Sequence, residues 1–429
     1  MFSILKNAWN TPDLRKKILF TLFIVLIFRI GSAIPVPFLE PDALKNMLGS
    51  SNNIFGYIDL MTGGNFSKAT LFALSITPYI NASIIIQLLT IAIPPLERLA
   101  KNGEDGQKKI AKITRYTTVG IALVLGLGYY FILRNGGALK EQYMVGKTGF
   151  FVAAIVILAF TAGAMLVMWL GDQITEKGVG NGISIILFAG ILSRLPASIA
   201  TLIAYTQLDP IYYFAVPLVL ALFAVIIYFI VVMTTAERKI PVQYAKRVVG
   251  RKMYGGQNSH IPLKVTLTGV LPIIFAGAIL AIPSTIASFI DPKGESWVGG
   301  LANALGYTSP LYAVLYFLLI IAFNYFYVAV QYNPVEMANN LRKNNGGIPG
   351  IRPGKPTSDF ISRILSKITL IGAVFLGLVA ILPILFTSFT GMNIAIGGTS
   401  VIIVVGVALE TAKTLESQLM MRHYKGFLE

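Results

Sequence analysis

The sequence predicts an all-α membrane protein, because it is rich in apolar residues and because its apolar runs are long. Of the 429 residues, 55% are hydrophobic and 13% are charged, whereas soluble domains carry about 25% charged residues. The mean hydropathy is +0.71. Several windows of about 18 residues contain no charge, which is long enough for a helix to cross a bilayer. We therefore expect a polytopic membrane protein and not a soluble enzyme.

Ten apolar stretches are expected to form transmembrane helices. Each holds about 17 to 25 residues, enough to cross about 30 Å of hydrocarbon as a helix. Their lack of alternating polarity argues against a β-barrel. The first stretch ends in IPVP and not in a signal-cleavage site, so it is expected to be retained. The expected spans are 18–38, 70–93, 116–133, 149–171, 183–203, 211–233, 265–289, 310–332, 368–388 and 394–412.

Basic residues predict the orientation of these spans. Of the 35 lysines and arginines, 27 lie at the two termini and in the connections on the same side, and 6 lie on the other side. Arg29 and Arg194 are the remaining two and fall inside spans. Since lysine and arginine accumulate in cytoplasmic loops, both termini are expected to be cytoplasmic.

The loop at 204–210 divides the chain into two expected halves, 1–203 and 204–429, with five spans each. An odd number of spans per half means that halves of the same fold insert with opposite topology. Such inverted halves place the functional path at their interface, near the midplane of the membrane. This inference rests on topology alone.

A short segment before the second span is unusual. Residues 54–62, IFGYIDLMT, are mostly apolar but too short to span, and Gly63 and Gly64 then interrupt the chain. One interpretation is an amphipathic turn at the membrane interface. The other is a re-entrant element inside a cavity, because non-helical backbone at membrane depth needs protein or water around it.

Residues for catalysis and metal binding are missing from the sequence. There is no cysteine, only two histidines, and no HExxH, GxSxG or GxxxxGK[ST] motif. The glycines of GVGNGIS at 178–184 are best explained as a turn before the fifth span. Acidic residues lie in loops or near helix ends, and Arg29 and Arg194 are best explained by snorkelling or by hydrogen bonds to carbonyls. We expect no enzyme activity, no cofactor, no metal and no charge-lined path for a solute.

The second span carries uncharged polar residues among isoleucines. Ile76, Ile80 and Ile84 form one helical stripe, which ends at the amide of Gln87. Plain helix packing with interhelical hydrogen bonds explains this pattern by itself.

Two long basic connections, 234–264 and 333–367, are expected to form a docking surface. The first interleaves aromatic and basic residues, and the second contains Gly-Gly, Pro349, Pro353 and Pro356, which stiffen it. The possible partners are nucleic-acid phosphate, an acidic protein or lipid headgroups; the positive-inside bias explains the sign of the charge but not the length. The docking residues that we predict are Arg251, Lys252, Arg342, Lys343 and Arg352.

Six segments in one order resemble the SecY family, the channel subunits of the bacterial protein translocase. They are FRIGSAIPVP, IDLMTGGNFSKATLFALSITPYINASIIIQLL, MWLGDQITEKGVGNGISIILFAG, YAKRVVGRKMYGGQNSHIPLKV, GIPGIRPGKPT and GGTSVIIVVGVALE. The resemblance implies an hourglass channel that opens to lipid at a lateral gate formed mainly by the second, third, seventh and eighth helices. Its substrate would be a polypeptide with a signal sequence, and its partners SecE, SecG, the SecA motor, the ribosome and membrane lipids. It also implies a bacterial cytoplasmic (inner) membrane location.

The same resemblance assigns site residues. The apolar pore ring would comprise Ile76, Ile80, Leu187, Ile274, Ala278 and Ile403. The segment 54–66 would be a plug, with Tyr57, Ile58, Asp59, Leu60, Met61, Thr62, Gly63 and Gly64 at its centre. Polar residues of the lateral gate would be Thr77, Asn81 and Gln87.

The chemistry of the residues agrees with such a channel. A narrow apolar neck resists ions by losing its water, and it does not bind any one sequence. Two other classes of function stay open at this point. A secondary transporter with inverted repeats would need membrane-embedded acids, and an intramembrane enzyme would need paired carboxylates or a metal motif.

Overall fold

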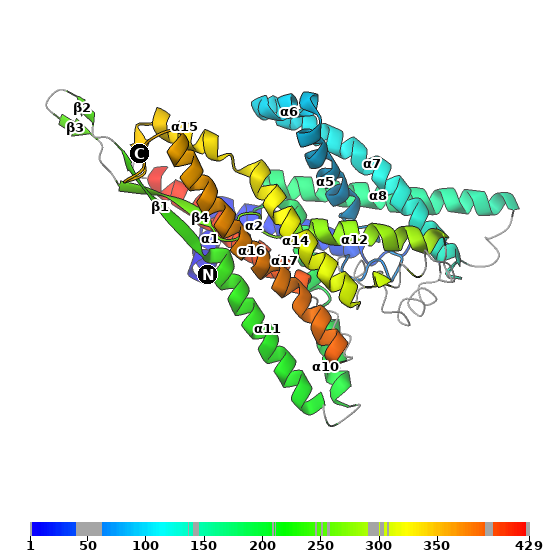
Figure 1. The fold of residues 1–429 in the computed structure, drawn as a ribbon. Helices are drawn as coiled ribbons and strands as arrows, with labels where there is room; N and C mark the ends of the chain where they lie inside the picture. The colour runs from blue at the N-terminus through cyan, green and yellow to red at the C-terminus, as the bar shows by residue number, and fades with distance from the viewer. Residues whose placement is uncertain are drawn as a thin grey trace.

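The computed structural model describes residues 2–39, 62–135, 137–139, 146–207, 210, 212–244, 247–249, 252–254, 258–290, 300, 304–306, 309–390 and 398–425. Within these residues the chain is mostly helical (Figure 1). The helices of the first half are α1 (Phe2–Asn10), α2 (Pro12–Gly31), α5 (Thr77–Ala92), α6 (Pro94–Lys101), α7 (Gly103–Asn135), α8 (Gly146–Lys177), α9 (Gly182–Leu192) and α10 (Leu195–Thr206). Those that follow are α11 (Tyr212–Thr235), α12 (Leu271–Ile290), α14 (Pro310–Gln331), α15 (Pro334–Lys343), α16 (Lys355–Thr390) and α17 (Gly398–Lys425).

The helices confirm a polytopic membrane protein. Each of the ten predicted spans overlaps a helix. Among the described residues, six helices are long and apolar enough to cross a membrane, and α5 with α6 forms a seventh candidate bent by 102°. The count of ten spans stays a prediction.

The first two predicted spans have wrong boundaries. Helix α2 ends at Gly31, where a Cβ atom would lie 2.1 Å from the ring of Phe72. The backbone beyond it then pairs with the chain that precedes α5, through a bridge between Pro35 and Thr70. Residues 62–76 form successive turns, and α5 begins only at Thr77, since Pro78 lies in its first turn, where proline is favoured.

Three large apolar clusters make up most of the core of the helical part. One is formed by buried residues up to Ala164, mainly from α7, α8 and the turns before α5. A second is formed by buried residues from Ile226 onward, in α11, α12, α14, α16 and α17. The third joins α2, α5, α8 and α9 to Ile403 and Val407 of α17. Division of the chain at residue 204 stays a prediction, but the third cluster is where the proposed halves meet.

The two basic connections fold together and do not project separately. Strands β1 (Glu237–Tyr244) and β4 (Asn258–Lys264) pair in antiparallel, β5 (Gly346–Gly347) adds to the other edge of β1, and β2 (Arg247–Val249) pairs with β3 (Lys252–Tyr254). Inward residues such as Ile240 and Val242 pack on α15 and α16, whose contributions include Leu341 and Ile361. We call this unit of β1, β4, β5, α15 and the start of α16 the sheet module. It lies at the same end of the molecule as both termini (Figure 1).

The sheet module corrects the expectation of a purely helical chain. Along β1, two alternate residues, Ile240 and Val242, are buried, as in a strand with one face on a core. That alternation was present in ERKIPVQY, but it covers few residues within a stretch dominated by charge.

Candidate functional site

A cavity of about 520 Å³ opens where the proposed halves meet. Its walls come from the start of α9, the turn that leads into α12, the end of α14 and one face of α17. Polar residues line one part and apolar residues the other. The polar residues are Asn181, Ser184, Thr234, Lys264, Thr266, Thr268, Gln331, Glu410, Lys413, Thr414 and Ser417.

Helix α17 supplies one continuous wall of this cavity. Ile403, Val407, Glu410, Thr414 and Ser417 all line it and follow each other at intervals of three or four residues, so they share one helix face. The face is apolar at its beginning and polar toward the C-terminal end. The cavity therefore passes from a polar wall to an apolar one.

Five of the six predicted ring residues lie at or near the apolar part of the cavity. Ile76, Ile80, Leu187, Ile274 and Ile403 belong to one apolar cluster or pack against it. Leu187, Ile274 and Ile403 also line the cavity. Ala278 is half-buried and lies outside that cluster. The structure thus brings five of the six together, and their function as a constriction stays a prediction.

The turn between α8 and α9 sets the direction of the wall that carries Leu187. Asn181 caps α9, its side-chain oxygen accepting from the backbone nitrogens of Ile183 at 3.0 Å and Ser184 at 3.4 Å. The interpretation of GVGNGIS as a turn before a helix is therefore confirmed. The Thr175 hydroxyl donates to the Gly171 carbonyl at 3.1 Å and accepts from the Gly182 nitrogen at 3.0 Å.

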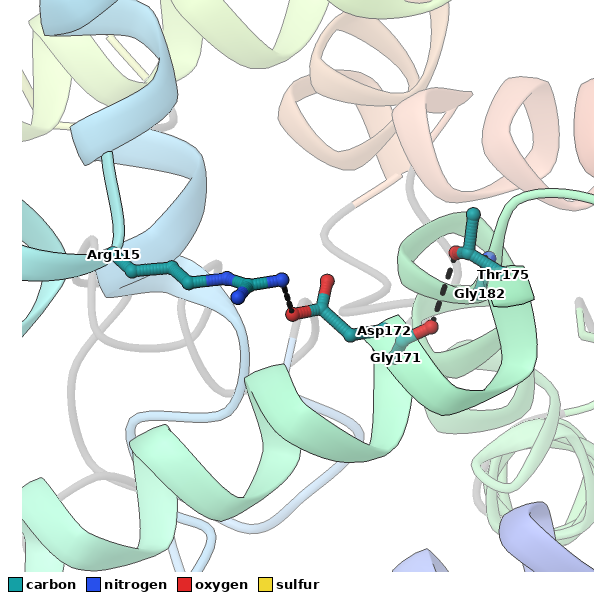
Figure 2. A network of polar contacts seen from close by, with 5 residues as sticks. All are labelled: Arg115, Gly171, Asp172, Thr175 and Gly182. Atoms are coloured by element: carbon teal, nitrogen blue, oxygen red, sulfur yellow. Dashed lines mark hydrogen bonds and ion pairs between the residues drawn. The ribbon is translucent and has the colours of Figure 1, made fainter. Parts of the chain in front are cut away.

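Close contacts around this turn leave no room for larger residues. A Cβ atom on Gly182 would lie 1.9 Å from the carbonyl oxygen of Gly171. Next to Gly171, Asp172 of α8 pairs with Arg115 of α7 at 2.7 Å, as Figure 2 shows. The ion pair and the Thr175 hydrogen bonds hold α7, α8 and α9 together on this side of the cavity.

Only the end of the predicted plug is within the described residues. Tyr57, Ile58, Asp59, Leu60 and Met61 lie outside them. Thr62 is 1% exposed, and Gly63 and Gly64 have positive φ angles of 72° and 85°. A Cβ atom on Gly63 would lie 2.6 Å from the carbonyl oxygen of Gly190, and one on Gly64 would lie 3.4 Å from the Arg194 guanidinium.

Hydrogen bonds fix the last residues of the predicted plug segment. Asn65 donates to the Ser32 hydroxyl at 3.1 Å, and the Tyr129 hydroxyl donates to the carbonyl oxygen of Phe66. The ring of Phe66 packs on Tyr129, with 4.3 Å between the ring centres. The non-helical backbone of residues 62–76 is mostly buried in protein, as non-helical backbone at membrane depth requires.

The two arginines that the sequence placed inside spans both lie at helix ends. Arg29 is exposed in the last turn of α2, which ends earlier than predicted. Arg194 follows α9, at the break before α10 and beside Gly64. The position of Arg29 near the end of α2 corrects the predicted one, whereas Arg194 lies near the centre of the candidate span Gly182–Ala204, as predicted.

The predicted gate residues lie along α5. Thr77 and Asn81 are half-buried and Gln87 is exposed. The Gln87 side chain lies close to the Tyr327 hydroxyl of α14, a helix from the other proposed half. The sequence analysis predicted Gln87 as a gate residue but did not predict Tyr327.

Of the predicted docking residues, three have described side chains. Arg342 and Lys343 end α15 and are exposed. Arg352 is exposed between β5 and α16, and its carbonyl oxygen accepts from the Thr357 hydroxyl at 2.8 Å. All three belong to the sheet module. Arg251 lies outside the described residues, and only the backbone of Lys252, in β3, is described.

Comparison with known proteins decides the family of the chain. A family model described as SecY matches residues 70–412. The chain belongs to the SecY family. The protein translocase subunit SecY of Bacillus subtilis (strain 168) is 44% identical over 440 residues and covers 100% of both chains. A solved protein-conducting channel has a TM-score of 0.63 at 19% identity, covering 94% of this chain and 92% of that one. Sec61 from the canine ribosome-channel complex of the endoplasmic reticulum has a TM-score of 0.59 at 18% identity, covering 94% and 92%.

The structure also brings out residues that the sequence analysis missed. The polar wall of the cavity was not predicted, although Glu410, Lys413, Thr414 and Ser417 have the spacing of one helix face. Asn324 was also missed. It is a buried amide within the apolar run of α14, and a polar residue in such a run is the signal that could have found it.

Proposed function

We propose that the chain is a protein-conducting channel, which moves unfolded secretory polypeptides across the membrane and releases transmembrane segments sideways into lipid. The single observation that carries this proposal is the cavity whose lining changes from polar residues to uncharged apolar residues between the proposed halves. Membership in the SecY family supports it, since the Bacillus subtilis relative is a protein translocase subunit.

The chemistry of the site suits a substrate of any sequence. A ring of Ile76, Ile80, Leu187, Ile274, Ala278 and Ile403 would dewet when closed and so resist ions. When a chain passes, aliphatic side chains give contact without directional hydrogen bonds. Neither step needs a catalytic residue, and the sequence has no nucleotide-binding motif, so the driving energy would come from a partner.

The proposed architecture is ten spans in two inverted halves, 1–203 and 204–429, with a lateral gate between α5 and α7 on one side and α12 and α14 on the other. The approach of Gln87 in α5 to Tyr327 in α14 supports this position for the gate. An apolar segment that reaches the gate gains about 25 cal/mol per Å² of buried apolar area on entering lipid, whereas a charged segment is penalised.

We further propose the partners and the location. Small membrane subunits of the SecE and SecG type, the SecA motor, the ribosome and membrane lipids would bind the chain in a bacterial inner membrane, with both termini cytoplasmic. The bias of lysine and arginine supports this orientation. The fold of Sec61 from a ribosome-channel complex supports a ribosome as one partner.

Transport of a precursor tests the proposed function. The chain is reconstituted in proteoliposomes with SecE, SecG, SecA and ATP, and an unfolded secretory precursor is added outside. We expect the precursor to become protected from protease, and removal of SecA to abolish protection. Uptake of small solutes without precursor protection would instead indicate a secondary transporter and contradict the proposal.

A further inference from the structure

A buried amide in α14 joins three parts of the second half. Asn324 is 3% exposed. Its side-chain oxygen accepts from the hydroxyl of Thr268, in the turn before α12, and its nitrogen donates to the Thr369 carbonyl of α16 at 3.0 Å. Both bonds are buried, so the loss of either would leave a polar group without a partner in apolar surroundings.

The turn that contains Thr268 is also pressed against α16. Residues 265–270 lead from β4 into α12. A Cβ atom on Gly372 of α16 would lie 2.5 Å from the carbonyl oxygen of Val265, so this approach requires glycine. The start of α12 is thus held at two points, by packing at Gly372 and by the hydrogen bond to Asn324.

The position of Ile274 follows from that of the turn. Ile274 lies in the first turn of α12, which begins at Leu271, and it lines the cavity together with Thr268 and Val270. Val270 also packs on α17, 3.2 Å from the place of a Cβ atom on Gly406. Movement of the turn would therefore move Ile274 relative to the rest of the ring.

We propose that Asn324 is a positioning residue for the pore ring. Through Thr268 it fixes the start of α12 and keeps Ile274 packed against the ring residues of the first half. This role rests on the proposed channel function. Hydrogen bonds between membrane helices are modest, so loss of this one should shift the closed-to-open equilibrium by about three- to tenfold.

The test uses two single variants and their combination. Asn324→Leu removes both hydrogen bonds, and Thr268→Val removes only the one that reaches the turn. Each purified variant is assembled with its membrane partners, and resting ion conductance is recorded in planar bilayers beside thermal unfolding. We expect resting conductance to rise about three- to tenfold in each single variant. The resting conductance of the double variant should be only slightly higher than that of Asn324→Leu, because both changes break the same hydrogen bond between Thr268 and Asn324.

A matched control separates positioning from general packing. Thr369 is 1% exposed, and its hydroxyl donates to the Leu365 carbonyl of the same helix at 2.7 Å. Thr369→Val keeps the carbonyl that Asn324 uses, so it should conduct like the wild type, as should Thr268→Ser. Wild-type conductance of both Asn324→Leu and Thr268→Val, or an equal leak from Thr369→Val, would overturn the positioning role.

A label at the ring keeps this test separate from that of the channel function. The chain has no cysteine, so Ile274→Cys introduces a unique thiol. We expect its rate of modification by a charged thiol reagent to change severalfold when Asn324→Leu is added. An unchanged rate would contradict the positioning role, whereas a wild-type chain that moves no precursor would contradict the proposed function.

Discussion

Gly63 shows how one residue limits what the backbone near the predicted plug can accept. Its φ angle is 72°, and a Cβ atom would lie 2.6 Å from the carbonyl oxygen of Gly190. Gly137 has a similar φ angle of 68°, but nothing lies within 4 Å of the place of its Cβ atom. The two glycines therefore separate the cost of backbone strain from the cost of a steric clash.

We expect Gly63→Ala to destabilise the protein more than Gly137→Ala does. Strain alone should cost about 1–2 kcal/mol in both variants, and the clash at Gly190 should cost about 1–3 kcal/mol more in the first. Thermal unfolding of the two purified variants measures the difference. Equal melting temperatures would show that the approach of Gly63 to Gly190 is not maintained in the protein.

A charge at the ring provides a second test at the residue scale. In Ile80→Lys, the ammonium group should hydrate the apolar neck, so resting conductance should rise by about tenfold or more. Discrimination against defective signal sequences should weaken. Ile80→Leu keeps the volume and the apolar character and is the control. If Ile80→Lys has the same resting conductance and the same discrimination against defective signal sequences as the control, the assignment of Ile80 to the ring is contradicted.

At the scale of elements, apolar runs predicted where helices form but not where they end. The ends depend on contacts with distant residues. Gly31 ends α2 against Phe72, and the turns of 62–76 are held by partners such as Ser32 and Tyr129. No window of neighbouring residues contains this information. The strands of the sheet module were missed for the same reason, since β5 lies about a hundred residues after its partner β1.

The sheet module gives a prediction for docking. Arg352 lies between Gly350 and Gly354, whose φ angles are 79° and 101°, and the hydrogen bond from Thr357 fixes its carbonyl. Lys355, in the first turn of α16, is also exposed. We therefore expect Arg352→Glu to weaken binding of SecA or the ribosome about tenfold and Lys355→Glu to weaken it less. Binding of detergent-solubilised variants at two salt concentrations measures this, and affinity indifferent to salt and to both changes would contradict docking at this surface.

At the scale of the whole molecule, the family could be predicted, but the cavity could not. Leu187, Ile274 and Ile403 were assigned from the resemblance, and the structure places them along one cavity. The polar wall of that cavity is assembled from five separate stretches of the chain, two of which contribute a single residue. Only folding brings these segments together. A sequence pattern within one helix can therefore indicate at most the polar residues that α17 contributes.

Removal of the predicted plug should separate closure from folding. The described anchor begins at Thr62, which is buried, and continues through Asn65 and Phe66 with its own hydrogen bonds. Deletion of 57–61 keeps this anchor, so we expect membrane insertion and thermal stability close to those of the wild type, with a higher resting conductance. A deletion variant as ion-tight as the wild type would contradict a sealing role for the segment.

The order of its segments along the chain also determines when the core of the sheet module can form during synthesis. Its core joins Ile240 and Val242 to Ile361, about 120 residues later in the chain. At a translation rate of about 5–20 residues per second, about 6–24 s pass before Ile361, which packs on β1, is synthesised. During that time α12 and α14 must insert into the membrane while the inward face of β1 is still uncovered. The nascent chain is therefore most exposed to aggregation and proteolysis in this interval, and slower translation through residues 265–345 would lengthen it.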